Sequence, residues 1–187
     1  MANSTTTLSP FVLDHGSVKS IQASVNSGNA NMLRITYQVN GDIDQLKIPE
    51  NSSPCWTDRL WEHTCFEAFI RVSGDPSYYE FNFSPSGEWA AFSFRDYRDG
   101  GPLQDESWSP EIVVCREADR IELAAVVRLH PSLTVRPGAQ LRIGLSAVIE
   151  ANNGTLSYWA LKHPGAKPDF HHPDSFALAL TFPGQSA

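Results

Sequence analysis

Two glutamates are the residues in this sequence most suited to acid–base or hydrogen-bonding chemistry. Glu67 lies in the run CFEAFIRV and Glu80 in the run YYEFNF, where Asn82 follows it at the same strand phase. If these runs form neighbouring strands, their alternate side chains share one face. A glycosidase needs two carboxyl groups roughly 5 to 9 Å apart across an open cleft. Acids also pair with arginines as structural ties, so catalysis, ligand binding and a purely structural role all remain open for this pair.

A second group of polar residues lies between positions 163 and 174. The segment HPGAKPDFHHPD contains His163, Asp169 and His171, and its three prolines restrict the loop to few conformations. Zinc requires imidazole nitrogens that converge on the ion, whereas the side chains of adjacent histidines tend to diverge. The chain has no HExxH-like spacing to force convergence. We therefore expect a hydrogen-bonding loop and no metal site.

Five tryptophans offer a different kind of chemistry, because an aromatic ring can hold the C–H face of a sugar. Trp61 flanks the run that contains Glu67, and Trp159 lies in TLSYWALKH, next to the His-rich segment. Most tryptophans instead fill a core or cap its end. We expect one or two of the five at a ligand, with Trp61 and Trp159 as the candidates. The chain has no Gly-x-Ser-x-Gly elbow, P-loop or GxGxxG motif to support acyl transfer or nucleotide chemistry.

A run of three strands between Trp61 and Arg98 must position Glu67, Glu80 and Asn82. Turn residues interrupt it at positions 74–77 and 84–87, and between the turns alternate residues point to opposite faces. The face expected in the core is apolar and carries Phe66, Ala68, Ile70, Tyr79, Phe81, Phe83, Ala90, Phe92 and Phe94. The other face mixes acids and amides with aromatic rings and carries Glu67, Glu80, Asn82, Arg95, Tyr78 and Trp89. This mixture favours a half-buried concave surface that binds a polar ligand, although a face simply covered by loops is the alternative.

Strand-like runs occupy most of the remaining chain, at residues 18–25, 31–39, 43–48, 111–117, 120–129, 141–150, 155–163 and 176–182. No run has a sustained helical period, and no composition shift marks a domain boundary. About a dozen short strands separated by turn residues predict an all-β fold, a two-sheet antiparallel β-sandwich with little helix. We expect residues 1–10 to form a disordered tail and residues 11–187 a single domain.

Composition excludes several classes of partner. The 187 residues carry a net charge of −7 and are 41% hydrophobic, which fits a globular protein without a basic surface for nucleic acid or anionic membranes. No apolar run approaches the length of a membrane span. The N-terminus lacks the basic and apolar regions of a signal peptide, so we expect a cytoplasmic location and three reduced cysteines. The sequence gives no indication of the oligomeric state.

Five motifs extend over most of the chain: Trp61-Glu62-x-Thr64-Cys65-Phe66-Glu67, Tyr79-Glu80-Phe81-Asn82-Phe83-Ser84-Pro85-Ser86-Gly87-x-Trp89-Ala90, Tyr97-Arg98, Tyr158-Trp159-Ala160-Leu161-x-His163-Pro164 and Lys167-Pro168-Asp169-Phe170-His171. With these motifs the chain resembles the DOMON-like superfamily and, more narrowly, the bacterial DOMON-like proteins associated with UDP-N-acetylmuramate dehydrogenase. That superfamily includes family 9 carbohydrate-binding modules and haem-binding cytochrome domains. The resemblance implies a β-sandwich of about eleven strands that binds a sugar or haem, usually without catalysis of its own.

The two implied ligands require different residues. Haem-binding members hold the iron with Met and His or with Met and Lys, whereas this chain has only Met1 and Met32, and Met32 lies at the start of a strand. His163 or His171 is available on one side of a haem, but a suitable methionine partner is missing. Sugar-binding members use aromatic rings with Glu, Asn and Arg around them, and this chain has residues of those types.

We therefore expect a non-catalytic module for a small ligand, a saccharide or a cell-wall precursor fragment, with no cofactor and no nucleic-acid or membrane partner. The expected ligand-binding residues are Trp61, Glu67, Glu80, Asn82, Arg98, Trp159, His163, Asp169 and His171. Two alternatives stay open. One is a haem-binding electron-transfer domain, and the other is a glycoside-acting enzyme that uses Glu67 and Glu80.

Overall fold

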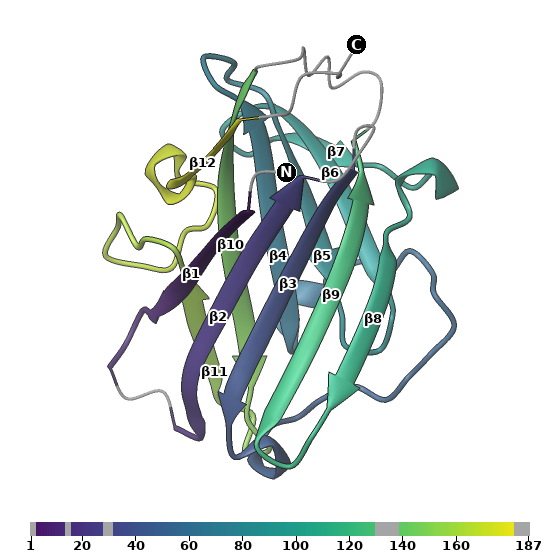
Figure 1. Cartoon of the computed structure of the whole chain (residues 1–187), viewed down its shortest axis with the longest axis vertical. Coiled ribbons are helices and arrows are strands. Elements are labelled where there is room, and N and C mark those ends of the chain that lie inside the picture. The colour runs from purple at the N-terminus through teal and green to yellow at the C-terminus, as the bar shows by residue number, and fades with distance from the viewer. Residues whose placement is uncertain (1–2, 14–15, 28–31, 130–138, 182–187) are drawn as a thin grey trace.

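A computed structural model describes residues 3–13, 16–27, 32–129 and 139–181, which form mainly antiparallel strands (Figure 1). The strands are β1 (Asn3–Pro10), β2 (Val18–Ser27), β3 (Met32–Gly41), β4 (Cys65–Val72), β5 (Tyr78–Phe83), β6 (Trp89–Asp96), β7 (Asp99–Pro102), β8 (Glu111–Arg116), β9 (Arg120–Arg128), β10 (Gln140–Glu150), β11 (Leu156–Ala160) and β12 (Leu178–Thr181). Single 3-10 turns lie at Ile43–Gln45, Leu60–Glu62, Glu106–Trp108 and Pro173–Ser175. Within the described ranges, no helix has the length and hydropathy needed to cross a bilayer.

The strands follow one continuous path that bends at β1 into two layers. The order is β7-β6-β5-β4-β10-β11-β1-β2-β3-β9-β8, and β12 pairs with β10 beside this path. Residues 3–8 of β1 pair with β2, whereas Ser9 and Pro10 pair with β11, so β1 belongs to both layers. We call the layer of β1, β2, β3, β9 and β8 sheet A, and the layer of β7, β6, β5, β4, β10, β11 and β12 sheet B. Figure 1 shows sheet A in front of sheet B. The predicted two-sheet all-β sandwich is confirmed.

The core between the sheets follows directly from the period-two pattern of the strands. In β3, the residues Leu33, Ile35, Tyr37 and Val39 alternate with half-buried or exposed ones and are fully buried. Tyr37 packs on Phe66 of β4 with ring centroids 5.0 Å apart. The Tyr37 hydroxyl donates a hydrogen bond of 2.6 Å to the backbone oxygen of Glu67, which ties sheet A to sheet B inside the core.

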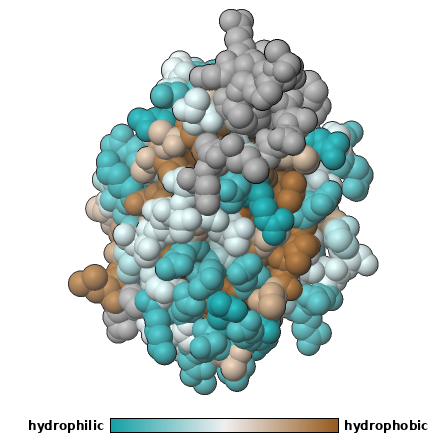
Figure 2. Space-filling model, viewed as in Figure 1, coloured by the Kyte–Doolittle hydropathy of each residue, from teal (hydrophilic) through white to brown (hydrophobic). Residues whose placement is uncertain are grey.

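The outward face of sheet A is an ordinary solvated surface. Figure 2 shows it as mostly hydrophilic or intermediate, with apolar residues scattered over it. In β3 this face carries Arg34, Thr36, Gln38 and Asn40. Polar residues without large aromatic rings are the usual composition of a strand face in water. The unusual mixture of acids and rings predicted for the other sheet is therefore specific to sheet B.

The structure corrects two local predictions. Residues 3–10 are not a disordered tail, because they form β1 and connect the two sheets. Residues 43–48 do not form a strand, because Ile43–Gln45 adopt a 3-10 turn, and within this segment only Leu46 forms a β-bridge, to Ala151. In both segments the local composition suggested the wrong element. Pairing with β2 and β11 makes β1 a strand, whereas local bonds from Gln45 N to Asp42 O and from Leu46 N to Ile43 O close the turn.

A third correction concerns the face assignment of β6. The pairs Phe81↔Ala91 and Phe83↔Trp89 place Ala91 and Trp89 on the core side, and Trp89 is 1% exposed. Phe92 and Phe94, which were predicted in the core, lie on the opposite face beside Glu80 and Tyr78. The loop between β5 and β6 has five residues, 84–88, rather than the four assumed from the turn motif. A shift of one residue in register moves every side chain of a strand to the other face.

Candidate functional site

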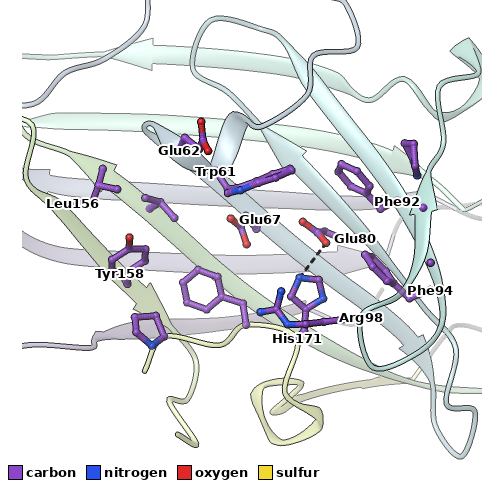
Figure 3. A pocket seen from close by; sticks show the side chains of 16 residues that line it. Trp61, Glu62, Glu67, Glu80, Phe92, Phe94, Arg98, Leu156, Tyr158 and His171 are labelled. Carbon is purple, nitrogen blue, oxygen red and sulfur yellow. Dashed lines mark ion pairs between the residues drawn. The ribbon is translucent and has the colours of Figure 1, made fainter. Parts of the chain in front are cut away.

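The outward face of sheet B is hollowed into a cavity of about 640 Å³ (Figure 3). Its lining consists of Trp61, Glu62, Glu67, Glu80, Phe92, Phe94, Arg98, Gly100, Gly101, Pro102, Val148, Leu156, Tyr158, Pro168, Phe170 and His171. Strands β4, β5, β6 and β10 supply the floor. The 3-10 turn at Leu60–Glu62, strands β7 and β11, and the loop between β11 and β12 supply the walls. The cavity therefore joins segments that are about a hundred residues apart in the sequence.

The two glutamates lie side by side on the floor. Glu67 pairs across the β4–β5 ladder with Asn82, and Glu80 is two residues before Asn82 on the same strand, so the two acids are diagonal neighbours on one face. They are only 3% and 5% exposed. The Asn82 amide donates to Oε1 of Glu80 at 2.8 Å, and the Ser146 hydroxyl donates to Oε2 of Glu67 at 3.3 Å. These bonds hold both carboxyl groups in fixed positions at the cavity surface.

Burial makes both carboxyl groups reluctant to ionise. It raises the pKa of Glu67 well above its ordinary value, and the neighbouring charge of Glu80 raises it further, against the hydrogen bond from Ser146. Burial also raises the pKa of Glu80, to about 7, although the hydrogen bond from Asn82 and the charge of Arg98 oppose it. Removing water from a carboxylate disfavours its charged form, and a second carboxylate nearby adds repulsion. Near neutral pH the pair therefore holds one or two protons.

His171 closes one side of the floor. The Tyr78 hydroxyl accepts from the Arg98 backbone N–H at 3.1 Å, and it lies 2.8 Å from Nδ1 of His171. Nε2 of the same ring lies 3.5 Å from Oε2 of Glu80 (Figure 3). We assign the ring hydrogen to Nε2, because it then faces the Glu80 oxygen while Nδ1 accepts from the Tyr78 hydroxyl. Burial, and then the charge of Arg98, lowers the pKa of His171 to about 4, while Asp169 opposes this. The imidazole is therefore neutral at physiological pH.

Arg98 reaches the cavity from the turn between β6 and β7, where it adopts a left-handed backbone conformation with φ of 54°. Its guanidinium donates to Asp169 at 2.9 Å and to the Tyr97 hydroxyl at 3.3 Å, and Tyr97 donates to Asp169 at 2.8 Å. Burial acts to raise the pKa of Asp169, but the bonds from Tyr97 and Arg98 and the charge of Arg98 outweigh it and lower the pKa overall. Left-handed backbone costs about 1 kcal/mol or more for a non-glycine residue, so these contacts must over-determine the turn. They fasten the β11–β12 loop to the rim of sheet B.

Aromatic rings form most of the apolar wall. Trp61 is 37% exposed, and its ring meets Phe92 edge-on with centroids 5.8 Å apart. Tyr158 and Phe170 face each other on the opposite wall at 6.4 Å. Phe94 stacks on Tyr78 at 4.7 Å, which fixes its ring against the floor. A ligand in the cavity therefore meets ring faces around a floor of buried carboxyl groups.

The structure brings five of the nine predicted ligand-binding residues into the lining: Trp61, Glu67, Glu80, Arg98 and His171. Asn82 and Asp169 do not line the cavity, but each bonds a residue that does. Trp159 and His163 are corrections to the prediction. Trp159 is 2% exposed in the core, and the His163 Nε2 atom lies 2.8 Å from the backbone oxygen of Ser9, outside the cavity.

Sequence reasoning missed several lining residues, among them Phe92, Phe94, Tyr158 and Phe170. The register error described above assigned the two phenylalanines of β6 to the core instead of the cavity. Tyr158 is paired with Val148, and Trp159 with Ala147, so Tyr158 occupies the cavity face of β11 and Trp159 the core face. The adjacent Tyr158 and Trp159 indicated that β11 presents an aromatic ring on each face, but the sequence could not show which ring faces the cavity.

The lining does not suit a haem group or a metal ion. It contains no methionine or lysine, and both nitrogens of its one histidine, His171, already face Tyr78 and Glu80. In the described part of the chain, no cluster of three or more His, Cys, Asp or Glu residues is arranged to hold a metal.

Three solved structures have the same fold at low sequence identity. One is a protein from Bacteroides uniformis whose proposed role is carbohydrate binding, with a TM-score of 0.68 and 14% identity over 96% of this chain and 86% of that chain. Two are structures of a family 9 carbohydrate-binding module from Caldicellulosiruptor kristjanssonii. The complex with cellotriose has a TM-score of 0.58 and 9% identity, over 96% and 83% of the two chains. The complex with glucose has a TM-score of 0.55 and 11% identity, over 92% and 81%.

These likenesses show a shared sandwich fold and nothing finer. They include the class of carbohydrate-binding module to which the predicted superfamily is related. No protein-family model matches the chain, and no curated protein matches its sequence. The DOMON-like assignment therefore stays a prediction from the motifs.

Proposed function

We propose that this chain is a non-catalytic saccharide-binding module whose ligand occupies the cavity on sheet B. The observation that carries the proposal is the composition of the lining, where aromatic rings surround two buried carboxyl groups and an arginine. Fold neighbours that are carbohydrate-binding modules, including complexes with cellotriose and glucose, support it. The identity of the saccharide, free or as part of a cell-wall precursor fragment, is open to the ligand panel described below.

A pyranose ring has apolar C–H faces and an equatorial belt of hydroxyl groups. The cavity offers a ring face for the first, chiefly Trp61, and polar groups for the second. Pockets for small ligands commonly have volumes of about 300 to 1,000 Å³, so a cavity of about 640 Å³ accommodates a mono- or disaccharide. Trp61 is partly exposed, so a ligand entering the cavity can reach its ring.

The buried acids give the site both donor and acceptor capacity. A protonated Glu67 donates one hydrogen bond and accepts others, whereas an ionised Glu80 only accepts. Nε2–H of His171 and the outer guanidinium edge of Arg98 supply further donors. A hydroxyl that both donates and accepts is therefore matched at several points of the floor, whereas an apolar ligand would leave these groups unpaired.

Isothermal titration calorimetry with glucose, cellobiose, cellotriose, N-acetylglucosamine and N-acetylmuramic acid tests the proposal. At least one saccharide should bind, and Trp61→Ala should weaken it at least tenfold because the ring face is removed, which corresponds to about 1.4 kcal/mol. Val113→Ala is the matched control, because Val113 is a large exposed apolar side chain on β8 of sheet A, far from the lining. Absence of binding across the panel, or equal affinity in both variants, would refute saccharide binding in this cavity.

Glycoside hydrolysis is a second candidate function, favoured by one specific observation. Glu67 and Glu80 differ in how strongly their environment resists ionisation, and such a difference is how an acid and a base are distinguished in one active site. Turnover of nitrophenyl glycosides at pH 5 to 8, lost in Glu67→Gln, would establish catalysis. Binding without turnover in both proteins would leave the binding module as the function.

A further inference from the structure

The two floor acids differ from the other charged groups around the cavity in the partners that touch them. Glu62 at the rim accepts from Nε of Arg59 at 3.0 Å. Arg98 gives its guanidinium bond to Asp169 at 2.9 Å. Arg98 is committed to Asp169 and acts on Glu67 and Glu80 through its charge alone, and the neutral His171 beside Glu80 carries no charge. In the described part of the chain, neither floor acid therefore has a charged cation in direct contact.

Glu67 shows the imbalance most clearly. Its side chain is 3% exposed, and in the described ranges Ser146 alone donates to its carboxyl group, at Oε2. The second oxygen, Oε1, has no donor there. Figure 3 shows the carboxyl groups of Glu67 and Glu80 among the side chains that line the cavity, which Trp61 also lines. This oxygen is not sealed from the cavity, so a ligand can reach it. A ligand that supplies a charged donor at this point forms a strong, charge-assisted hydrogen bond.

The walls suit a positively charged donor better than a neutral one. Trp61, Phe92, Phe94 and Phe170 present aromatic rings to the same space. The face of an aromatic ring attracts an ammonium group, most strongly where water is excluded, and indole is the best ring for this. Two carboxyl groups below and rings around them form a site in which both kinds of attraction act on one cation.

We propose that the ligand is an amine-bearing saccharide, bound as its ammonium ion with the nitrogen against Glu67 and Glu80. The proposal rests on the saccharide-binding function proposed above and names its substrate class. A hexosamine satisfies the geometry, because its ring packs on Trp61 while its amine reaches the floor. An acidic sugar without a free amine would instead bring a carboxylate against the two buried acids, so uronic and N-acetylmuramic acids are the least favoured ligands.

The proposal implies that binding releases protons. The ionisable groups that face the pair or its neighbours are Tyr37 from β3, Cys65 from β4, Tyr78 from β5, Arg98 from the β6–β7 turn, Asp169 and His171 from the β11–β12 loop, and Glu62 from the 3-10 turn. Burial raises the pKa of both floor acids, to about 7 for Glu80. An ammonium ion beside them favours the ionised carboxylates, so protons leave the pair as the amine binds.

Titration of the full chain with D-glucosamine hydrochloride, D-glucose and N-acetyl-D-glucosamine at about pH 6.5 tests the proposal. At this pH the free pair holds at least one proton and the amine is charged. Glucosamine should bind at least tenfold more tightly than glucose, about 1.4 kcal/mol, and acetylation should remove the advantage because it removes the charge. Parallel titrations in two buffers of different ionisation enthalpy should show release of about one proton with glucosamine and none with glucose.

Glu67→Gln and Glu80→Gln should each abolish the preference for glucosamine over glucose, because an amide has nearly the same shape as the carboxyl group but carries no negative charge for the ammonium ion. Glu111→Gln, an exposed acid at the start of β8 in sheet A, is the matched control and should keep the preference. Thermal denaturation of each variant confirms that it is folded.

The outcomes separate this inference from the proposed function. Equal or weaker binding of glucosamine relative to glucose overturns the amine proposal and leaves saccharide binding in place. The amine proposal alone also fails if none of the three sugars binds while another saccharide of the wider panel does. Failure of every saccharide to bind removes the proposed function and the inference together.

Discussion

Replacing Glu80 with Gln should stabilise the folded protein above pH 7 and change little near pH 5. In the folded state the carboxyl is 5% exposed, and burial raises its pKa from 4.5 to about 7. Between these two values the folded chain holds a proton that the unfolded chain has already lost. The wild-type protein therefore loses stability as the pH rises through this window, and the loss is complete above pH 7.

The magnitude follows from the same pair of values. Raising the pKa from 4.5 to about 7 lowers the free energy of unfolding by about 3 kcal/mol once the carboxyl is ionised in both states. Glutamine has no charge at any pH, and its carbonyl oxygen still accepts from Asn82. Glu80→Gln should consequently exceed the wild type by about 3 kcal/mol near pH 8 and match it within about 1 kcal/mol near pH 5.

Urea denaturation at several pH values between about 5 and 8 measures this difference. The fluorescence of Trp89 and Trp159 reports unfolding, because both indoles are buried in the core. Glu111→Gln on the surface of sheet A serves as the control and should shift the free energy of unfolding by no more than about 0.5 kcal/mol throughout. A difference between Glu80→Gln and wild type that stays constant with pH, or a less stable variant near pH 8, would refute the view that burial dominates at this site.

Three further predictions concern the packing around the cavity and core. Tyr37→Phe deletes the buried hydrogen bond to the backbone of Glu67 and should lower the free energy of unfolding by about 1 to 2 kcal/mol in urea; an unchanged value would contradict a role in joining the sheets. Gly100→Ala would place a Cβ 1.9 Å from a backbone oxygen of β6 and should cost more than about 2 kcal/mol, whereas Gly101→Ala meets nothing within 4 Å and should be nearly neutral. Equal thermal shifts in the two alanine variants would contradict this packing argument. Burial lowers the pKa of His171 from 6.5 to about 4, so the unfolded chain binds a proton first as the pH falls. The free energy of unfolding should therefore decrease by up to about 3 kcal/mol between pH 6.5 and about pH 4. His171→Gln should reduce this decrease, and an unchanged decrease would count against a buried neutral imidazole.

The fate of β6 shows where reasoning from the sequence reached its limit. The alternation in Trp89–Asp96 was correct as a period, but its phase relative to β5 depended on a loop of five residues rather than four. Both phases place large aromatic rings on each face, so composition could not choose between them. Pairing with β5 chose, and it placed Phe92 and Phe94 in the cavity and Trp89 in the core.

The same limit applies to the aromatic pair in β11. Tyr158 and Trp159 must point in opposite directions, and either ring suits a sugar site or a core. Register with β10 placed Tyr158 at the cavity. Asp169 and His171 were predicted as ligand-binding residues from their types alone. The structure gives them different roles, because Asp169 bonds Arg98 at the rim, whereas His171 contacts Tyr78 and lines the cavity.

The sequence by itself determined the all-β sandwich, the outward direction of Glu67 and Glu80, and the core direction of Phe66 and Phe81, because these depend on a period of two within single strands. The tertiary structure alone decided which rings surround the acids, how deeply the acids are buried, and that the β11–β12 loop forms a wall beside them. Those features depend on strand register and on contacts between segments about a hundred residues apart, and local residue patterns do not encode either of them.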